Sequence, residues 1–158
     1  MRTVAAALLL LLSASVMAQD VMDVDTFDGV VDFSMTTKRL HGLIETEPWE
    51  EIDNDRLFIL QGSVASTTVL DPNPESYFAL VELVDSEWIG LEAIGIYRVQ
   101  VLLAGPDFAA MVPARMPRDP GPEIIRTNDD LLVVGRFGVL EFTDGSRLPI
   151  VQAYHIRR

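Results

Sequence analysis

Residues 129–157 read "DDLLVVGRFGVLEFTDGSRLPIVQAYHIR" and contain two strand-like segments around one tight turn. The first, 129–142, is rich in branched apolar residues and has two internal glycines, which often mark bends in strands. The turn carries Asp144-Gly145, a pair typical of hairpin tips. The second segment, 148–157, predicts a strand with Leu148, Ile150, Tyr154 and Ile156 on one face.

Three more strands are predicted upstream, at 57–70, 77–84 and 96–105. The first contains Gly62, where we expect a bulge or a sharp bend. In the third, apolar and polar residues alternate along the strand. One of its faces carries Tyr97, Val99, Val101 and Leu103, and the other carries Arg98 and Gln100.

The connections between these strands differ in character. Residues 71–76 predict a turn, and residues 85–95 predict a loop or a short helical turn. Residues 106–112 can form one helical turn, with Pro106 at its first position. A proline-rich stretch, "MVPARMPRDPGPE" at 111–123, follows.

Five strands with one helix-sized segment between the third and the fourth resemble the OB-fold, a five-stranded Greek-key barrel that needs bends to close. The resemblance covers 57–158 and includes the "DDLLVVGRF…LPIVQAYHIR" ending, which is similar to the last hairpin of many bacterial OB barrels, exported ones among them. The sequence departs from the pattern where the usual helix is reduced to one turn and a proline-rich loop. We therefore expect an all-β chain with a minor helical part, and a small β-sandwich is the alternative fold.

Residues 19–56 are polar and acidic and precede the expected barrel domain of 57–158. Helical spacing from Phe27 to Ser34 predicts a short helix, although Val31, Phe33 and Met35 also alternate as in a strand. "ETEPWEEIDND" at 45–55 predicts a linker or loop.

The first 20 residues, "MRTVAAALLLLLSASVMAQD", have the order of a secretory signal peptide. Arg2 precedes an apolar run at 4–12, and small residues lead to a plausible cleavage site after Ala18. A membrane anchor is the alternative, but the run is short of the roughly 20 apolar residues that a spanning helix needs. We expect residues 1–18 to be removed and the protein to be periplasmic or secreted, without a later membrane span.

The chain of 158 residues has a net charge of −12 and no cysteine. Residues 19–110 carry 18 acids and 4 bases, whereas 111–158 carry 6 acids and 7 bases. Proteins bind nucleic acid by neutralising phosphates with basic side chains, so we expect no nucleic-acid partner.

Signatures of catalysis and of metal binding are weak. Zinc sites usually need three or four ligands, and the two histidines, His41 and His155, lie far apart in the sequence. "DVDTFDG" at 23–29 has the wrong acid spacing for an EF-hand. The chain has no cysteine nucleophile and no Gly-x-Ser-x-Gly motif. We expect a non-enzyme without a metal or a cofactor.

The OB-fold resemblance implies a ligand face across the second and third strands, flanked by the loops at 71–76 and 143–147. The candidate ligand-binding residues are Tyr77, Trp88, Arg98, Gln100, Asp144 and Arg147. For Tyr77 and Trp88, a place in the core or under a lid is the alternative.

The proline-rich stretch has two interpretations. It is a preformed extended segment that docks on a partner, or it covers an open end of the barrel. The residues that would carry docking are Pro113, Pro117, Pro120, Pro122, Arg115 and Arg118.

The function we expect is that of a non-catalytic exported module that binds a protein or a glycan of the cell envelope. The alternatives are a hydrolase of envelope polymers and a protein that binds a small ion or small ligand.

Overall fold

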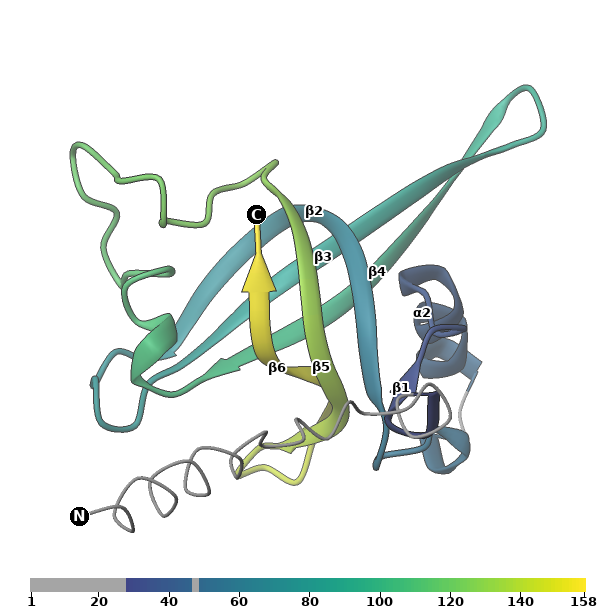
Figure 1. The fold of residues 1–158 in the computed structure, drawn as a ribbon, viewed down its shortest axis with the longest axis horizontal. Helices are drawn as coiled ribbons and strands as arrows, with labels where there is room; N and C mark the ends of the chain where they lie inside the picture. The colour runs from purple at the N-terminus through teal and green to yellow at the C-terminus, as the bar shows by residue number, and fades with distance from the viewer. Residues whose placement is uncertain (1–27, 47–48) are drawn as a thin grey trace, which may run out of the picture.

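The computed structural model describes residues 28–46 and 49–158 (Figure 1). The expected signal peptide lies outside the described residues, and so does the acidic segment at 23–29 except for its last two residues. The elements in chain order are β1 (Val31–Asp32), α2 (Thr37–Thr46), the 3-10 helix η1 (Trp49–Glu51), β2 (Leu57–Asp71), β3 (Phe78–Ile89), β4 (Ala93–Ala104), the 3-10 helix η2 (Pro106–Phe108), β5 (Asp130–Glu141) and β6 (Arg147–Arg157).

Strands β2 to β6 form a closed barrel. Their order around it is β2-β3-β4-β6-β5, and β5 pairs again with β2 to close the circle. The β4–β6 pair is parallel, with Val101 opposite Val151, and the other barrel pairs are antiparallel. The expected all-β, OB-like five-stranded barrel is therefore confirmed. The β-sandwich alternative is wrong, because the strands close into one barrel instead of forming two separate sheets that pack face to face.

Strand β2 closes the barrel because it is long enough to serve two neighbours. Its first half pairs with β5 and its second half pairs with β3, and both ladders meet at Ser63. A Cβ atom on Gly62 would lie 2.8 Å from the carbonyl oxygen of Val84. Only glycine allows this approach without a shift, so the bend expected at this position is present.

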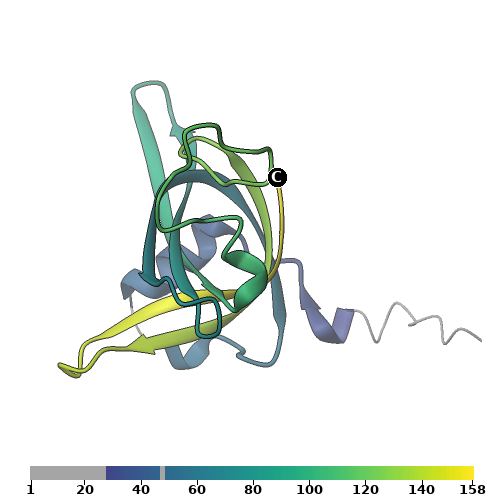
Figure 2. The same cartoon turned by 90° about the vertical axis from the view of Figure 1, so that its left-hand side faces the viewer.

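One continuous core fills the barrel and is closed at both ends. Leu40 of α2 is fully buried at the end of the barrel beside Arg98 of β4, and Val112 and Ile125 are buried at the opposite end, where β4 stops. Figure 2 shows the barrel from the side on which the η2 segment lies. The N-terminal segment and the loop after η2 thus replace the single helix that usually closes an OB barrel.

Residues 28–30 are helical, as expected for a short helix over 27–34, but the longer N-terminal helix lies later in the chain. Residues 31–32 form β1, which runs parallel to β2, and the ten-residue helix begins at Thr37. Thr36 caps it, because its Oγ1 accepts a hydrogen bond from the Arg39 N–H at 3.1 Å. The short helix expected over 27–34 is wrong for residues 31–34, because the apolar stripe that packs on the core belongs to the next segment.

The loop expected at 85–95 is mostly strand. β3 continues to Ile89, β4 begins at Ala93, and only the three residues between them turn. Gly90 has a φ of 68°, which a glycine adopts freely. Residues 85–97 form a two-stranded ribbon, here called the arm, that projects from the barrel (Figure 1).

Strand β6 contains a bulge that the sequence pattern does not reveal. His155 pairs with Val134 and Ala153 pairs with Gly135, so Tyr154 is the extra residue. Ala153 and Ile156 are therefore both buried, whereas Tyr154 and His155 are exposed. The expected common face of Leu148, Ile150, Tyr154 and Ile156 is wrong, because the bulge reverses the alternation within the strand.

Among residues 28–46 and 49–158, no helix combines the length and the apolar character that crossing a bilayer requires.

Candidate functional site

The face implied by the OB-fold resemblance is the outer face of β3 and β4. Val99, Val101 and Leu103 are at most 1% exposed and point into the barrel. Alternate side chains of a strand point to opposite faces, so Arg98 and Gln100 lie outside, as expected. The outer face is therefore available at these positions.

Arg98 is held in place from two sides. Its Nη1 atom lies 2.8 Å from Oε1 of Glu82 on β3, and this ion pair is partly exposed. Its backbone N and O atoms lie 3.2 and 3.0 Å from Nδ1 of His41 on α2. Gln100 lies directly opposite Glu82 in the β3–β4 ladder. This part of the face offers a charged donor and a charged acceptor side by side.

The outer face continues onto the arm and becomes apolar there. Trp88 is 71% exposed, Ile94 54% and Ile96 51%. Trp88 pairs with Ile94, and Ser86 pairs with Ile96, so the three apolar side chains share one face. The sequence interpretation found Trp88 but missed both isoleucines. The alternation of Ile94 and Ile96 with glycine and tyrosine between them was the available signal.

The opposite face of the arm is tied to α2. The Nζ atom of Lys38 contacts Glu87 and lies 5.3 Å from the centre of the Tyr97 ring. The Tyr97 hydroxyl donates to Glu87 Oε1 at 2.7 Å. The hydrogen bond from Lys38 lowers the pKa of Glu87 and raises the pKa of Lys38, so both groups stay charged near neutral pH. These contacts hold the base of the arm against the helix.

A polar pocket of about 380 Å³ lies where the arm leaves the barrel. Ser63 Oγ donates to Asp130 Oδ1 at 2.5 Å on one side of it, and Asp85 and Ser86 form another side. Its hydroxyl and carboxylate groups could bind a hydroxylated ligand. The described residues contain no group of three or more His, Asp or Glu side chains that could hold a metal ion.

The structure does not bring all the candidate ligand-binding residues together. Tyr77 is 2% exposed, and its hydroxyl donates to the carbonyl oxygen of Val112. Burial raises the pKa of Tyr77. The proposal that Tyr77 contacts a ligand is wrong, and the alternative of a core residue is correct.

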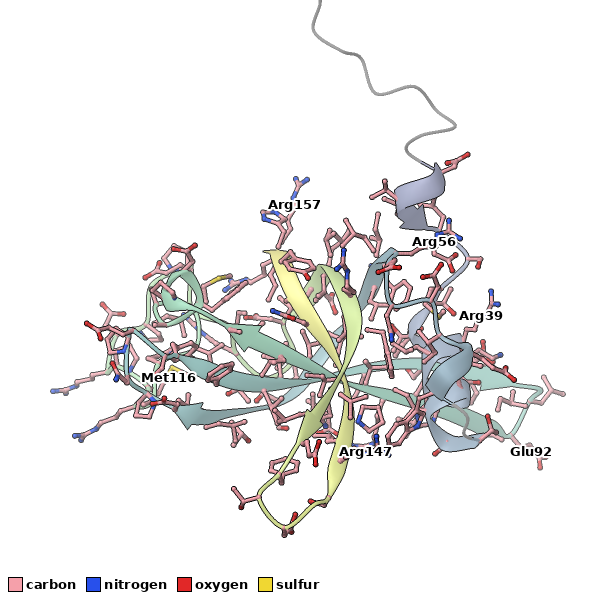
Figure 3. All side chains as sticks on the ribbon, turned by 90° about the horizontal axis from the view of Figure 1, so that it is seen from below. Arg39, Arg56, Glu92, Met116, Arg147 and Arg157 are labelled. Atoms are coloured by element: carbon pink, nitrogen blue, oxygen red, sulfur yellow. The ribbon has the colours of Figure 1, made fainter. Side chains whose placement is uncertain are left out.

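Asp144 and Arg147 belong to the β5–β6 hairpin. Asp144 accepts hydrogen bonds from the Ser146 hydroxyl at 2.6 Å and the Ser146 N–H at 2.9 Å, which lower its pKa. The guanidinium of Arg147 lies 5.8 Å from the centre of the Trp49 ring. Figure 3 shows Arg147 well apart from Glu92 at the arm tip. Of the six candidates, only Trp88, Arg98 and Gln100 share the outer face of β3 and β4.

The proline-rich stretch is anchored at both ends on the barrel. Val112 and Ile125 are part of the core, and Ile125 N–H donates to the Met111 carbonyl at 2.8 Å. Arg126 and Arg158 donate to the carbonyl oxygens of Pro120 and Pro122, at 2.8 and 2.9 Å. These contacts agree with the lid interpretation.

The outer surface of the same stretch carries Arg115, Arg118 and Met116, all exposed (Figure 3 labels Met116). Within the described part of the chain, neither arginine has a hydrogen bond or an ion pair. The two arginines therefore do not pair with acids of the described chain, and a docking role for the stretch stays a prediction.

No protein-family model matches the chain, and no curated protein matches its sequence. The function therefore has to be argued from the geometry alone.

Proposed function

We propose that this protein is an exported, non-catalytic binding module that docks on a protein of the cell envelope through the outer face of the arm. The observation that carries the proposal is the exposure of Trp88, Ile94 and Ile96 on one face of a projecting ribbon. Export rests on the signal-peptide pattern of residues 1–18.

The composition of this face supports protein binding. Contiguous exposed apolar side chains mark interaction sites, and tryptophan and arginine are enriched among residues that dominate binding energy. The Arg98–Glu82 ion pair lies on the same face and would form a polar rim beside the apolar part. Two isoleucines beside the tryptophan favour a protein surface, because they offer a sugar no hydrogen bonds.

A glycan is the second candidate ligand, favoured by a different observation. The polar pocket at the base of the arm is lined by Gln61, Ser63, Ser86 and Asp130. Such groups can bind sugar hydroxyls while the exposed ring of Trp88 stacks on a sugar ring.

The enzyme alternative has one defined form in this structure. Asp85 and Asp130 line the same pocket, and a glycan hydrolase needs two carboxyl groups on opposite sides of the scissile bond. Asp130 already accepts a hydrogen bond from Ser63, which suits a structural role. Absence of envelope-polymer turnover by the wild-type protein would agree with the non-catalytic proposal, and turnover that Asp130→Asn abolishes would contradict it.

The test of the proposed function is crosslinked affinity capture from the envelope of the native host. Trp88→Ala should reduce capture of a protein partner at least about tenfold, as expected for a tryptophan that dominates an interface. The control is Leu70→Ala, which removes another exposed apolar side chain from β2, outside the arm. Equal capture by wild type and by Trp88→Ala would refute the proposal, and capture of a glycan alone would favour the second candidate.

A further inference from the structure

The arm carries negative charge that the protein itself does not balance. Residues 85–97 contain three acids and no lysine or arginine. One of the acids, Glu87, is paired with Lys38 of α2. The other two, Asp85 and Glu92, are exposed and have no ion pair within the described part of the chain. The arm therefore presents two carboxylates without a counter-charge.

Arg98, the first basic residue after the arm, does not change this balance. Its guanidinium lies 2.8 Å from Glu82 and is already paired there. A ligand that approaches the outer face therefore meets the unpaired carboxylates, whereas the neighbouring positive charge is neutralised.

The two carboxylates lie at opposite ends of the apolar face. Asp85 borders the polar pocket at the base of the arm, and Glu92 lies at the arm tip (Figure 3). Trp88 lies between them along β3 and is 71% exposed. About five residues of extended chain separate the two ends, so at 3.3 Å for each residue the carboxylates lie roughly 17 Å apart.

The pocket adds to the negative charge at the base of the arm. Asp85 and Asp130 both line it, and its lining includes no basic side chain. Each carboxylate accepts one hydrogen bond through Oδ1 from a neighbouring serine, and in the described chain the Oδ2 atoms have no partner. Arg157 and Arg158 line a separate pocket that Asp130 also borders, but neither pairs with it in the described residues. Asp85 is thus the less compensated of the two acids.

We propose, resting on the proposed function, that the protein partner of the arm carries two basic groups about 17 Å apart with apolar side chains between them. One lysine or arginine enters the pocket beside Asp85, and the other meets Glu92. The apolar side chains between them cover Trp88, Ile94 and Ile96. Burying a carboxylate without a counter-charge is costly, so a partner without these basic groups binds less well.

A lipid surface is a less favourable occupant of the same face. Glu92 lies at the tip and would be the first group to enter the hydrocarbon, where a carboxylate is expensive. Between Asp85 and Tyr97 the two strands of the arm pair only with each other in the described chain. Their outer edges therefore bring backbone groups that hydrocarbon cannot satisfy.

The charge of the whole chain acts in the same direction. The net charge of −12 attracts a basic partner at long range and speeds its association. Salt screens this attraction but changes apolar contacts little. Binding should therefore weaken as the salt concentration rises.

Titration of the purified protein with two synthetic peptides, followed by proton–nitrogen NMR, tests the inference. The first peptide has seven residues and capped ends, with lysine at the first and last positions, valine at the third and fifth, and threonine elsewhere. An extended chain places its two lysines on one face, about 20 Å apart, within reach of both carboxylates because lysine side chains are long and flexible. The second peptide has glutamate in place of both lysines.

We expect the lysine peptide to shift the signals of residues 85–97, including the indole N–H of Trp88. It should bind at least about tenfold more tightly than the glutamate peptide at low salt, and this difference should shrink at high salt.

A double variant, Asp85→Asn with Glu92→Gln, removes both charges and keeps the size of the side chains. The amide oxygen at position 85 can still accept the Ser86 N–H, so the fold should be retained. Its affinity for the lysine peptide should fall at least about tenfold, and it should no longer distinguish the two peptides. Glu75→Gln is the matched control, because Glu75 is an exposed acid in the loop between β2 and β3, at the other end of β3.

Three results overturn the inference: unchanged arm signals at millimolar lysine peptide, equal affinity for the two peptides, or equal affinity of the double variant and the wild type. In envelope capture, loss of the protein partner with Trp88→Ala but full capture by the double variant would keep the proposed function and overturn the basic partner. Binding of the wild type, but not of Trp88→Ala, to neutral lipid vesicles would assign the apolar face to a membrane and overturn both proposals.

Discussion

Tyr77 connects the start of β3 to the segment that covers one end of the barrel. Its ring lies in the core, and its hydroxyl reaches the carbonyl oxygen of Val112, 35 residues later in the chain. Gly105 N–H also donates to the Tyr77 carbonyl at 2.9 Å. One residue thus fixes the path of the chain after β4.

The first prediction concerns this hydroxyl. Tyr77→Phe leaves the Val112 carbonyl buried without a partner, so the free energy of unfolding should fall by about 1–3 kcal/mol. Urea denaturation followed by circular dichroism measures the change. Tyr154→Phe, at a residue that is 51% exposed, is the control and should change little. Equal midpoints for Tyr77→Phe and wild type would show that the hydrogen bond contributes nothing.

For single residues, the sequence separates the inner from the outer side chains of a strand only where apolar and polar residues alternate regularly. It predicted the inner Val99 and the outer Arg98 correctly. It could not decide between the two interpretations of Tyr77 and Trp88, because a tertiary contact decides each. Tyr77 is covered by Val112 of a distant loop, whereas Trp88 lies on a ribbon that leaves the barrel.

Among the elements, the strands were easier to predict than the connections. The expected strand at 129–142 agrees with β5 within a residue at each end, since its apolar residues are β-branched and continuous. The arm was missed because Gly90, Gly95 and nearby acids resemble a loop when read locally. The bulge at Tyr154 was missed because only the pairing with β5 reveals an extra residue.

The second prediction concerns the proline-rich stretch as an element. Replacing 113–122 with a Gly/Ser linker of equal length removes four prolines that restrict the unfolded chain. At about 0.4–1 kcal/mol for each proline, the free energy of unfolding should fall by about 2–4 kcal/mol. Thermal and urea unfolding measure the loss.

The control for this replacement keeps the prolines and changes both Arg115 and Arg118 to Ser. It should be as stable as wild type, because both side chains are exposed. A Gly/Ser version of full stability would contradict the lid interpretation. Loss of envelope capture in the stable arginine variant would instead give the stretch a docking role.

On the scale of the whole molecule, the N-terminal segment and the barrel share one core. Met35, Leu40 and Ile52 belong to the same cluster of buried side chains as Phe58 and Leu60 of β2. Thr37 also donates from its hydroxyl to the Gln61 carbonyl at 2.9 Å. The sequence could not show this packing, because the segment is short, acidic and only weakly periodic.

The last prediction follows from that shared core. A fragment of residues 57–158 lacks the three side chains that this segment adds to the shared core, each comparable to a large-to-small core substitution that costs about 2–5 kcal/mol. Their sum rivals the roughly 5–15 kcal/mol that stabilises an ordinary domain, so the fragment should not fold cooperatively. A chain that begins at residue 28 is the control and should unfold in one transition. Proton–nitrogen NMR spectra and calorimetry distinguish the two. A well-dispersed spectrum and a sharp transition for 57–158 would mean that the barrel is stable without α2, and that the helix serves to hold the arm through Lys38 and His41.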